Sequence, residues 1–250
     1  MFIKSVYIQQ SALARSESYL RAIPSIAGME PLSLPSPVTF FVGENGTGKS
    51  TLLEAIAVAF GFNPEGGSKN YNFSSKDTHS DLYDFIKIIK TVRHAKDGFF
   101  LRAESYYNTV TEMEHLDKSG LPSSPSFYDN YGGINPHEQS HGESFLGLVH
   151  HRFRGNGLYI LDEPEAALSP SRQLTLLAEI HRLVLEDSQF IIASHSPILL
   201  AYPGAQIYSF DQNTVTPISY KETGHYQITK NFLDCPERMM DILLNNSPEP

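Results

Sequence analysis

The chain has 250 residues, of which 40% are hydrophobic and 19% charged, so it can bury a core and belongs to neither the disordered nor the fibrous class. Its net charge of −9 excludes a uniformly basic surface for nucleic-acid binding. Its single cysteine excludes an internal disulfide framework, and we expect this thiol to be partly buried. No stretch approaches the roughly 18 uninterrupted apolar residues of a membrane span and no signal-peptide pattern opens the chain, which predicts a soluble, cytoplasmic protein without stable membrane insertion.

The N-terminal part predicts two strands and a helix. Residues 2–8 alternate apolar and polar side chains, as a half-buried strand does. Residues 38–42 are mostly apolar and short enough to form a buried strand. An apolar repeat with helical spacing then follows Lys49, and Gly61 is its expected C-cap.

The middle of the chain predicts loops and short strands. Residues 63–76 are rich in Gly, Ser and Asn and indicate an exposed loop. Residues 85–92 and 99–103 predict two strands joined through the turn signal at 96–98. Residues 119–141 carry several prolines and a Gly-Gly pair, which predicts a mobile loop.

The C-terminal half alternates strands with helices, and its last part, residues 211–250, is a mixed tail. The predicted elements are a helix over 144–153, a strand over 158–161, a helix over 171–185, a strand over 190–193 and a terminal helix over 236–244. This alternation favours one α/β domain over residues 1–250, with a mostly parallel central sheet flanked by helices. We also expect a small antiparallel β lobe near the N-terminus.

The strongest motif is a glycine-rich loop of the pattern G-x-x-x-x-G-K-[ST] between the strand at 38–42 and the following helix. Backbone N–H groups of such a loop, together with the helix N-terminus, surround phosphate groups. Lys49 would reach the β- and γ-phosphates and Ser50 would bind Mg²⁺. The predicted nucleotide-binding residues are Gly43, Glu44, Asn45, Gly46, Thr47, Gly48, Lys49, Ser50 and Thr51.

Two further apolar strands end in polar residues. The strand at 158–161 runs into Asp162 and Glu163, which we assign to the metal ion and to the attacking water, respectively. The strand at 190–193 runs into His195, at the edge of a parallel sheet where ligands bind, and this side chain could donate to the γ-phosphate. Without the other motifs, the two acids would be interpreted as solvated residues at a strand end, and the histidine as a structural residue. Together with the phosphate loop, they indicate catalytic roles for Lys49, Glu163 and His195.

A fourth element, Ser140-His141-Gly142-Glu143, precedes the acidic strand by about twenty residues. The order of glycine-rich loop, this element, Asp162-Glu163 and His195 resembles that of ATP-binding-cassette (ABC) ATPases, which implies a P-loop NTPase fold and the ligands ATP and Mg²⁺. The resemblance implies that Ser140, Gly142 and Glu143 form a signature motif that meets the γ-phosphate bound to a facing subunit. An ATP-dependent homodimer would follow. Taken by itself, the stretch could equally be a helix-capping box.

Within that superfamily, residues 38–200 resemble compact soluble ATPases related to the RecF/SMC type, including AAA-family ATPases of phage-defence modules. About 35 residues separate Glu104 from Ser140, too few for the long SMC coiled coil. No clear Q-loop glutamine follows the strand at 99–103, so Glu104 is the nearest candidate for the metal, and the adenine-stacking aromatic is open, with Tyr19 as one guess. Ser169 stands where the family's D-loop has an aspartate.

Two function classes follow from the resemblance. The favoured class is an ATP hydrolase whose dimerisation acts as a switch on DNA or on a partner effector. The alternative is the nucleotide-binding subunit of an ABC membrane transporter, for which a docking subdomain is not evident in residues 119–141. The basic clusters at 93–96 and 150–154 are better explained as solvated surface than as DNA contacts, and no structural zinc site is expected.

Overall fold

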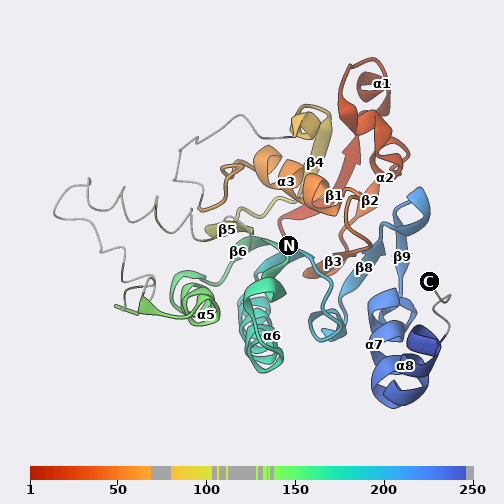
Figure 1. The fold of residues 1–250 in the computed structure, drawn as a ribbon. Helices are drawn as coiled ribbons and strands as arrows, with labels where there is room; N and C mark the ends of the chain where they lie inside the picture. Colours follow the sequence, from red (N-terminus) through yellow and green to blue (C-terminus); the bar gives the residue numbers. More distant parts are fainter. Residues whose placement is uncertain are drawn as a thin grey trace.

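The computed structural model describes residues 1–68, 80–102 and 138–245, together with positions 106, 111, 128, 132, 133 and 135. Two sheets of different character enclose one helix, and further helices cover the outer face of the larger sheet (Figure 1). The predicted α/β architecture, with its mostly parallel sheet and small antiparallel lobe, is confirmed.

The larger sheet has six strands, of which five are parallel and the edge strand β9 is antiparallel. In order across the sheet they are β5 (Asp97–Arg102), β6 (Gly157–Asp162), β7 (Gln189–Ala193), β3 (Val38–Val42), β8 (Gln206–Ser209) and β9 (Thr216–Ile218). Every residue of β3, β6 and β7 is buried. Since helices or strands cover both faces of these central strands, their sequences are continuous apolar runs rather than alternating ones.

The smaller sheet is antiparallel and consists of β2 (Leu32–Ser33), β1 (Ile3–Ile8) and β4 (Ile86–Lys90). The hairpin expected over 85–103 is therefore wrong, because β4 pairs with β1 while β5 pairs in parallel with β6. The expected turn residues Asp97 and Gly98 lie inside β5. A Cβ on Gly98 would lie 2.7 Å from the Leu158 carbonyl oxygen, so this glycine permits close strand packing instead of a turn.

Helix α3 (Lys49–Phe60) lies between the two sheets, and its apolar side chains share one core with Phe41, Ile160 and Ile191. Helices α5 (His141–Arg152) and α6 (Pro170–Leu185) pack on the opposite face, in a second core that contains Phe40 and Tyr159. Neighbouring residues of one strand thus point into different cores. Because the phosphate loop connects β3 to α3, both cores fix its position.

Two short helices, α1 (Gln10–Leu13) and α2 (Pro24–Ala27), lie between β1 and β2 in the chain. The C-terminal part forms α7 (Gly224–Asp234) and α8 (Pro236–Asn245) beside β9 (Figure 1). The predicted terminal helix corresponds to α8, whereas α7 was not expected from the sequence. Cys235, between the two helices, is exposed rather than partly buried.

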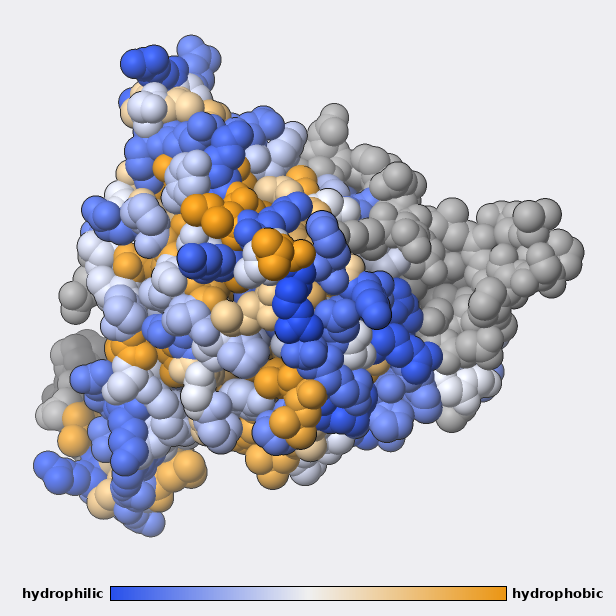
Figure 2. Space-filling view, turned by 180° about the vertical axis from the view of Figure 1, so that it is seen from behind, coloured by the Kyte–Doolittle hydropathy of each residue, from blue (hydrophilic) through white to orange (hydrophobic). Residues whose placement is uncertain are grey.

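Helices α7 and α8 project from the body of the protein and carry apolar side chains at their surface, at the lower left of Figure 2. The exposed members of this set are Ile228, Phe232, Leu233, Met240, Ile242, Leu243 and Leu244. No helix in the described ranges is both long and apolar enough to cross a membrane.

One loop prediction and one helix start also need correction. The exposed loop expected over 63–76 is wrong for its first part, because Asn63 and Ser68 are buried and Gly67 exchanges two backbone hydrogen bonds with Phe100. Residues 69–76 lie outside the described residues, as does most of the predicted loop 119–141. The helix expected from residue 144 begins at His141, because Ser140 caps it.

Candidate functional site

The glycine-rich loop takes a backbone shape that requires glycine at its ends. Gly43 has φ +141° and Gly48, the residue before α3, has φ +93°, which is the region that side chains disfavour. A Cβ on Gly48 would also lie 3.0 Å from the Ile26 side chain. Helix α2 therefore packs directly against the loop and leaves no room there for a larger residue.

Lys49 is the first residue of α3, and its side chain is buried inside the loop. Its Nζ donates to the carbonyl oxygens of Gly43, over 2.7 Å, and of Glu44, over 2.8 Å. Burial lowers the pKa of Lys49, while the nearby carboxylates of Glu163 and Asp162 oppose that shift. A cation held in this position at a helix N-terminus suits a phosphate, so the loop fits the predicted ligand.

The next residue, Ser50, contacts the acid at the end of β6. The Ser50 hydroxyl donates to Oδ1 of Asp162 over 2.9 Å. On its other oxygen, Asp162 lies 3.8 Å from Nε of Arg102, whose guanidinium also forms a 2.7 Å ion pair with the buried Glu54. A hydroxyl and a carboxylate are the oxygen ligands that Mg²⁺ uses at phosphate sites, so this pair fits the ion.

The third predicted metal ligand, Glu104, lies outside the described residues. Among the described residues no group of three or more His, Cys, Asp or Glu side chains could hold a metal ion. Two protein oxygens are nevertheless enough for Mg²⁺ at a nucleotide site, because water and phosphate oxygens complete its shell.

Glu163 and His195 face each other at the ends of β6 and β7, with Oε1 and Nε2 3.3 Å apart. Glu163 has φ +50°, an uncommon conformation for a residue other than glycine, and its N–H donates to the Ala193 carbonyl. The Nε2 atom of His195 is buried without a hydrogen-bond partner among the described residues. This nitrogen is available to a ligand at the same edge of the sheet.

Glu165 was not predicted as a site residue, yet it fixes the turn that carries His195. Its Oε1 accepts hydrogen bonds from Ser194 Oγ at 2.9 Å, from the His195 N–H at 2.5 Å and from the Ser196 N–H at 3.1 Å. The sequence offers only its spacing, two residues after Glu163, as a signal. Because one carboxylate oxygen accepts all three bonds, the backbone at the end of β7 is held firmly in place.

His225, in the first turn of α7, is the second unpredicted residue of the site. Its Nε2 lies 2.8 Å from Nδ1 of His195, and burial lowers its pKa. Both histidines line a cavity of about 620 Å³ with residues of the glycine-rich loop. The other residues that line it are Glu44, Asn45, Asp211, Gly224, Ile228 and Thr229. Helix α7 thus shares a cavity with the phosphate loop.

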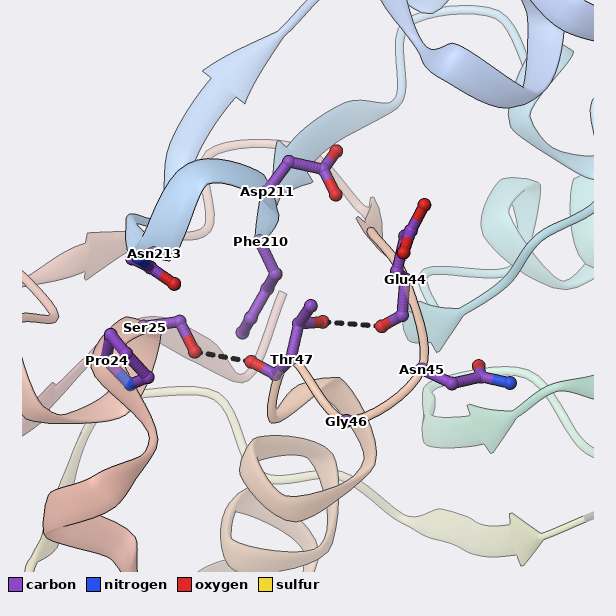
Figure 3. A pocket seen from close by; sticks show the side chains of 9 residues that line it. All are labelled: Pro24, Ser25, Glu44, Asn45, Gly46, Thr47, Phe210, Asp211 and Asn213. Carbon is purple, nitrogen blue, oxygen red and sulfur yellow. Dashed lines mark hydrogen bonds between the residues drawn. The ribbon is translucent and has the colours of Figure 1, made fainter.

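A second cavity, of about 510 Å³, lies on the α2 side of the loop (Figure 3). The Ser25 hydroxyl donates to the Thr47 carbonyl, and the Thr47 hydroxyl donates to the Glu44 carbonyl over 2.8 Å. The lining residues are Pro24, Ser25, Glu44, Asn45, Gly46, Thr47, Phe210, Asp211 and Asn213. Tyr19 is not among them, and its side chain is mostly exposed.

The Ser140-His141-Gly142-Glu143 element lies at the start of α5. Ser140 and Glu143 form a reciprocal capping box, and Arg172 from α6 donates to both side chains. Hydrogen bonding from Ser140 lowers the pKa of Glu143. A Cβ on Gly142 would lie 2.7 Å from the Ala167 carbonyl. These residues line neither of the two cavities beside the phosphate loop.

One arginine in each of the two basic clusters is paired with an acid. Arg93 forms an exposed ion pair with Asp187, and Arg152 donates to both oxygens of Asp97. Pairing reduces the positive charge that either cluster could offer to nucleic acid.

The comparisons with known protein families match two overlapping parts of the chain. Residues 20–126 match a family model described as an AAA domain. Residues 98–201 match one described as "AAA domain, putative AbiEii toxin, Type IV TA system". The first match covers the glycine-rich loop, and the second covers both acids and His195.

One curated relative, an ABC transporter G family member named STR2 from Medicago truncatula, is 26% identical over 64% of this chain and 24% of the transporter. The chain therefore spans about a quarter of that relative's length. Among solved structures, a protein described as a metal-chelate type ABC transporter has a TM-score of 0.47 at 15% identity, with 79% of each chain covered. The SMC head domain from Thermotoga maritima has a TM-score of 0.46 at 14% identity, with 88% of this chain and 99% of the other covered.

Proposed function

We propose that this chain, which resembles ABC-type P-loop ATPases of the RecF/SMC branch, binds ATP with Mg²⁺ and hydrolyses it to ADP and phosphate. One observation carries this proposal. Lys49, the Ser50–Asp162 pair and the Glu163–His195 pair converge where the neighbouring parallel strands β3, β6 and β7 end. The carboxyl edge of such a sheet is where α/β proteins bind ligands.

Each group then has a defined task. Loop N–H groups and Lys49 bind the β- and γ-phosphates, and Ser50 and Asp162 hold the Mg²⁺, which neutralises phosphate charge when bound. Glu163 orients the attacking water and accepts its proton as the water oxygen bonds to the γ-phosphorus and the bond to ADP breaks. His195 donates from Nε2 to a γ-phosphate oxygen, which is consistent with the absence of another hydrogen-bond partner for that nitrogen among the described residues.

The nucleoside half of ATP would extend into the cavity beside α2 (Figure 3). A volume of about 510 Å³ suits a group of that size. Asn213 and Asp211 would supply polar contacts, and Pro24 and Phe210 would supply apolar surface. This assignment replaces Tyr19, which does not line the cavity.

We further propose that ATP brings two copies together as a switch that acts on DNA or on a partner effector. Ser140 and Glu143 are exposed at the start of α5, where a second subunit could present its bound γ-phosphate to them. The N-terminus of α5 would favour the negative charge of that phosphate. The alternative role as a transporter subunit is not better supported.

The test uses two variants, each with a matched surface control. Lys49→Ala should abolish binding of fluorescent ATP, whereas exposed Lys87→Ala should bind it normally. Glu163→Gln should bind ATP, hydrolyse it at least about a hundredfold more slowly and form a dimer with ATP by light scattering. Glu237→Gln, on exposed α8, is its control.

Two results would contradict the assignment. If Glu163→Gln hydrolysed ATP at the wild-type rate, Glu163 would not orient the water. If the same variant bound ATP but stayed monomeric at every protein concentration tested, the dimeric switch would be wrong while ATP binding stood.

A further inference from the structure

The contact between His195 and His225 connects the phosphate site to the C-terminal helix α7. His225 Nε2 lies 2.8 Å from His195 Nδ1, and the two rings are inclined by 53°. The two residues come from separate parts of the fold, the end of β7 and the first turn of α7. The proposed chemistry uses only the other nitrogen of His195, so the role of this contact is unassigned.

Several hydrogen bonds fix the start of α7, which carries His225. The Tyr220 hydroxyl donates to the Pro197 carbonyl over 2.9 Å, which ties the segment before α7 to the turn that carries His195. The buried Thr223 caps α7 by accepting from the Tyr226 N–H, and its own hydroxyl donates to the Tyr220 carbonyl. His225 therefore has a fixed position relative to His195 rather than the freedom of an exposed helix residue.

Donor and acceptor roles within the pair follow from what surrounds it. In a hydrogen bond between two neutral imidazoles, one nitrogen carries the proton and the other accepts it. On its far side, His195 Nε2 lies 3.3 Å from Oε1 of Glu163. If Nε2 carried no proton, its lone pair would face the carboxylate, which is repulsive. The favourable arrangement places the proton of His195 on Nε2, so Nδ1 accepts and His225 Nε2 donates.

We propose that His225 is a positioning residue that, together with Glu163, holds His195 in the Nε2–H tautomer and thereby presents an N–H donor to the γ-phosphate. This inference rests on the proposed ATPase function for its purpose, but the tautomer itself can be observed without nucleotide. Because α7 carries His225, displacement of that helix would remove the donor that orients His195. Helix α7 is thus part of the proposed catalytic arrangement.

The neighbourhood of His225 is consistent with a neutral imidazole. Burial is the largest cause of its lowered pKa, His195 is the second, and Lys49 acts in the same direction. The carboxylates of Asp211 and Glu44 oppose these effects, but the net direction is downward. A neutral His225 has a single ring proton, which the contact with His195 places on Nε2.

The test is the nitrogen NMR spectrum of the full chain labelled with ¹⁵N-histidine, recorded without nucleotide at neutral pH. In the wild type, the shifts of His195 should be those of the Nε2–H tautomer. In His225→Phe, which has an aromatic ring but no donor, only Glu163 still favours that tautomer, so the shifts should move toward those of a mixture with the Nδ1–H form. In His225→Gln, whose amide Nε2 is the same number of bonds from Cα, the wild-type tautomer should persist.

Kinetics provide a second readout. His225→Phe should lower kcat by about tenfold with KM for ATP changed less than about twofold, the loss expected for one hydrogen bond to a charged group, and His225→Gln should recover most of the rate. His181→Phe is the matched control. His181 lies on α6 and contacts Tyr202 rather than His195, so its replacement should leave both readouts unchanged.

The proposal is overturned if wild-type His195 carries its proton on Nδ1, or if His225→Phe leaves both the His195 shifts and kcat unchanged. A wild type that does not hydrolyse ATP would refute the proposed function instead. In that case the spectra without nucleotide would still decide whether His225 sets the tautomer.

Discussion

The hydroxyl of Ser50 donates to Oδ1 of Asp162 over 2.9 Å, across a separation of 112 residues in the chain. Ser50 lies in the first turn of α3 after β3, and Asp162 ends β6, with β7 between these strands. Parallel pairing brings the carboxyl ends of all three strands to the same edge. This contact is the link between the phosphate loop and the acidic strand, and it marks where a divalent cation would be held.

Removal of the Ser50 hydroxyl should weaken the response to Mg²⁺. We expect Ser50→Ala to raise the Mg²⁺ concentration for half-maximal ATPase rate by about tenfold or more, because one of the two proposed protein ligands is lost. A Mg²⁺ titration at saturating ATP measures this. Thr175→Ala, an exposed hydroxyl on α6, should leave the titration unchanged. Equal Mg²⁺ requirements for Ser50→Ala and wild type would contradict the assignment.

Gly142 should contribute to the stability of the single chain, independently of ATP and of a second subunit. A Cβ there would lie 2.7 Å from the Ala167 carbonyl, a backbone atom that cannot move aside. We expect Gly142→Ala to reduce the free energy of unfolding by about 1–3 kcal/mol, as overpacking does, measured by urea denaturation. Gly28→Ala, where the nearest atom would be 3.4 Å away, is the control. If both variants unfolded at the same urea concentration, Gly142 would have no packing role.

Glu165 should affect catalysis through the position of His195. Glu165→Ala removes the acceptor of three hydrogen bonds at residues 194–196, so we expect kcat to fall by at least about tenfold as the imidazole loses its orientation. Glu165→Gln retains an oxygen acceptor and should keep most of the rate. Steady-state ATPase assays of both variants make the comparison. Equal losses in the two variants would show that the charge of Glu165, not its acceptor geometry, is what counts.

Tyr159 should make stability depend on pH in the alkaline range. Burial, followed by the charge of Asp97, raises the pKa of its hydroxyl well above the ordinary 10.0. The unfolded chain therefore releases this proton at a lower pH than the folded chain does. The stabilisation is complete below pH 10 and is lost as pH rises from there toward the folded pKa.

Urea unfolding at several pH values between about 9 and 11 tests this linkage. Below pH 10, wild type should be more stable than Tyr159→Phe, because the Tyr159 hydroxyl donates to Asp97 and to the Arg154 carbonyl. Above pH 10, the difference in the free energy of unfolding between the two proteins should narrow. Exposed Tyr83→Phe should show no such narrowing. A constant difference between wild type and Tyr159→Phe across the range would contradict the shifted titration.

Helices and strands were predictable from the sequence where local chemistry dictates local structure. The buried strand over 38–42, the helix from Lys49 and the terminal helix were predicted with bounds within a residue or two. The prediction for the β5 region was wrong because Asp97-Gly98 has the composition of a turn. In the structure, the glycine instead permits the close approach of β5 to Leu158. Composition does not distinguish these two uses of glycine.

The sequence by itself determined the phosphate loop, the polar strand ends and the parallel α/β class, because glycine conformations and apolar runs are properties of neighbouring residues. Only the tertiary structure decided which side chains meet. Glu165 and His225 act on His195 through contacts that span 30 residues. Such contacts depend on where β7 and α7 pack, and no periodicity within the chain encodes that distance.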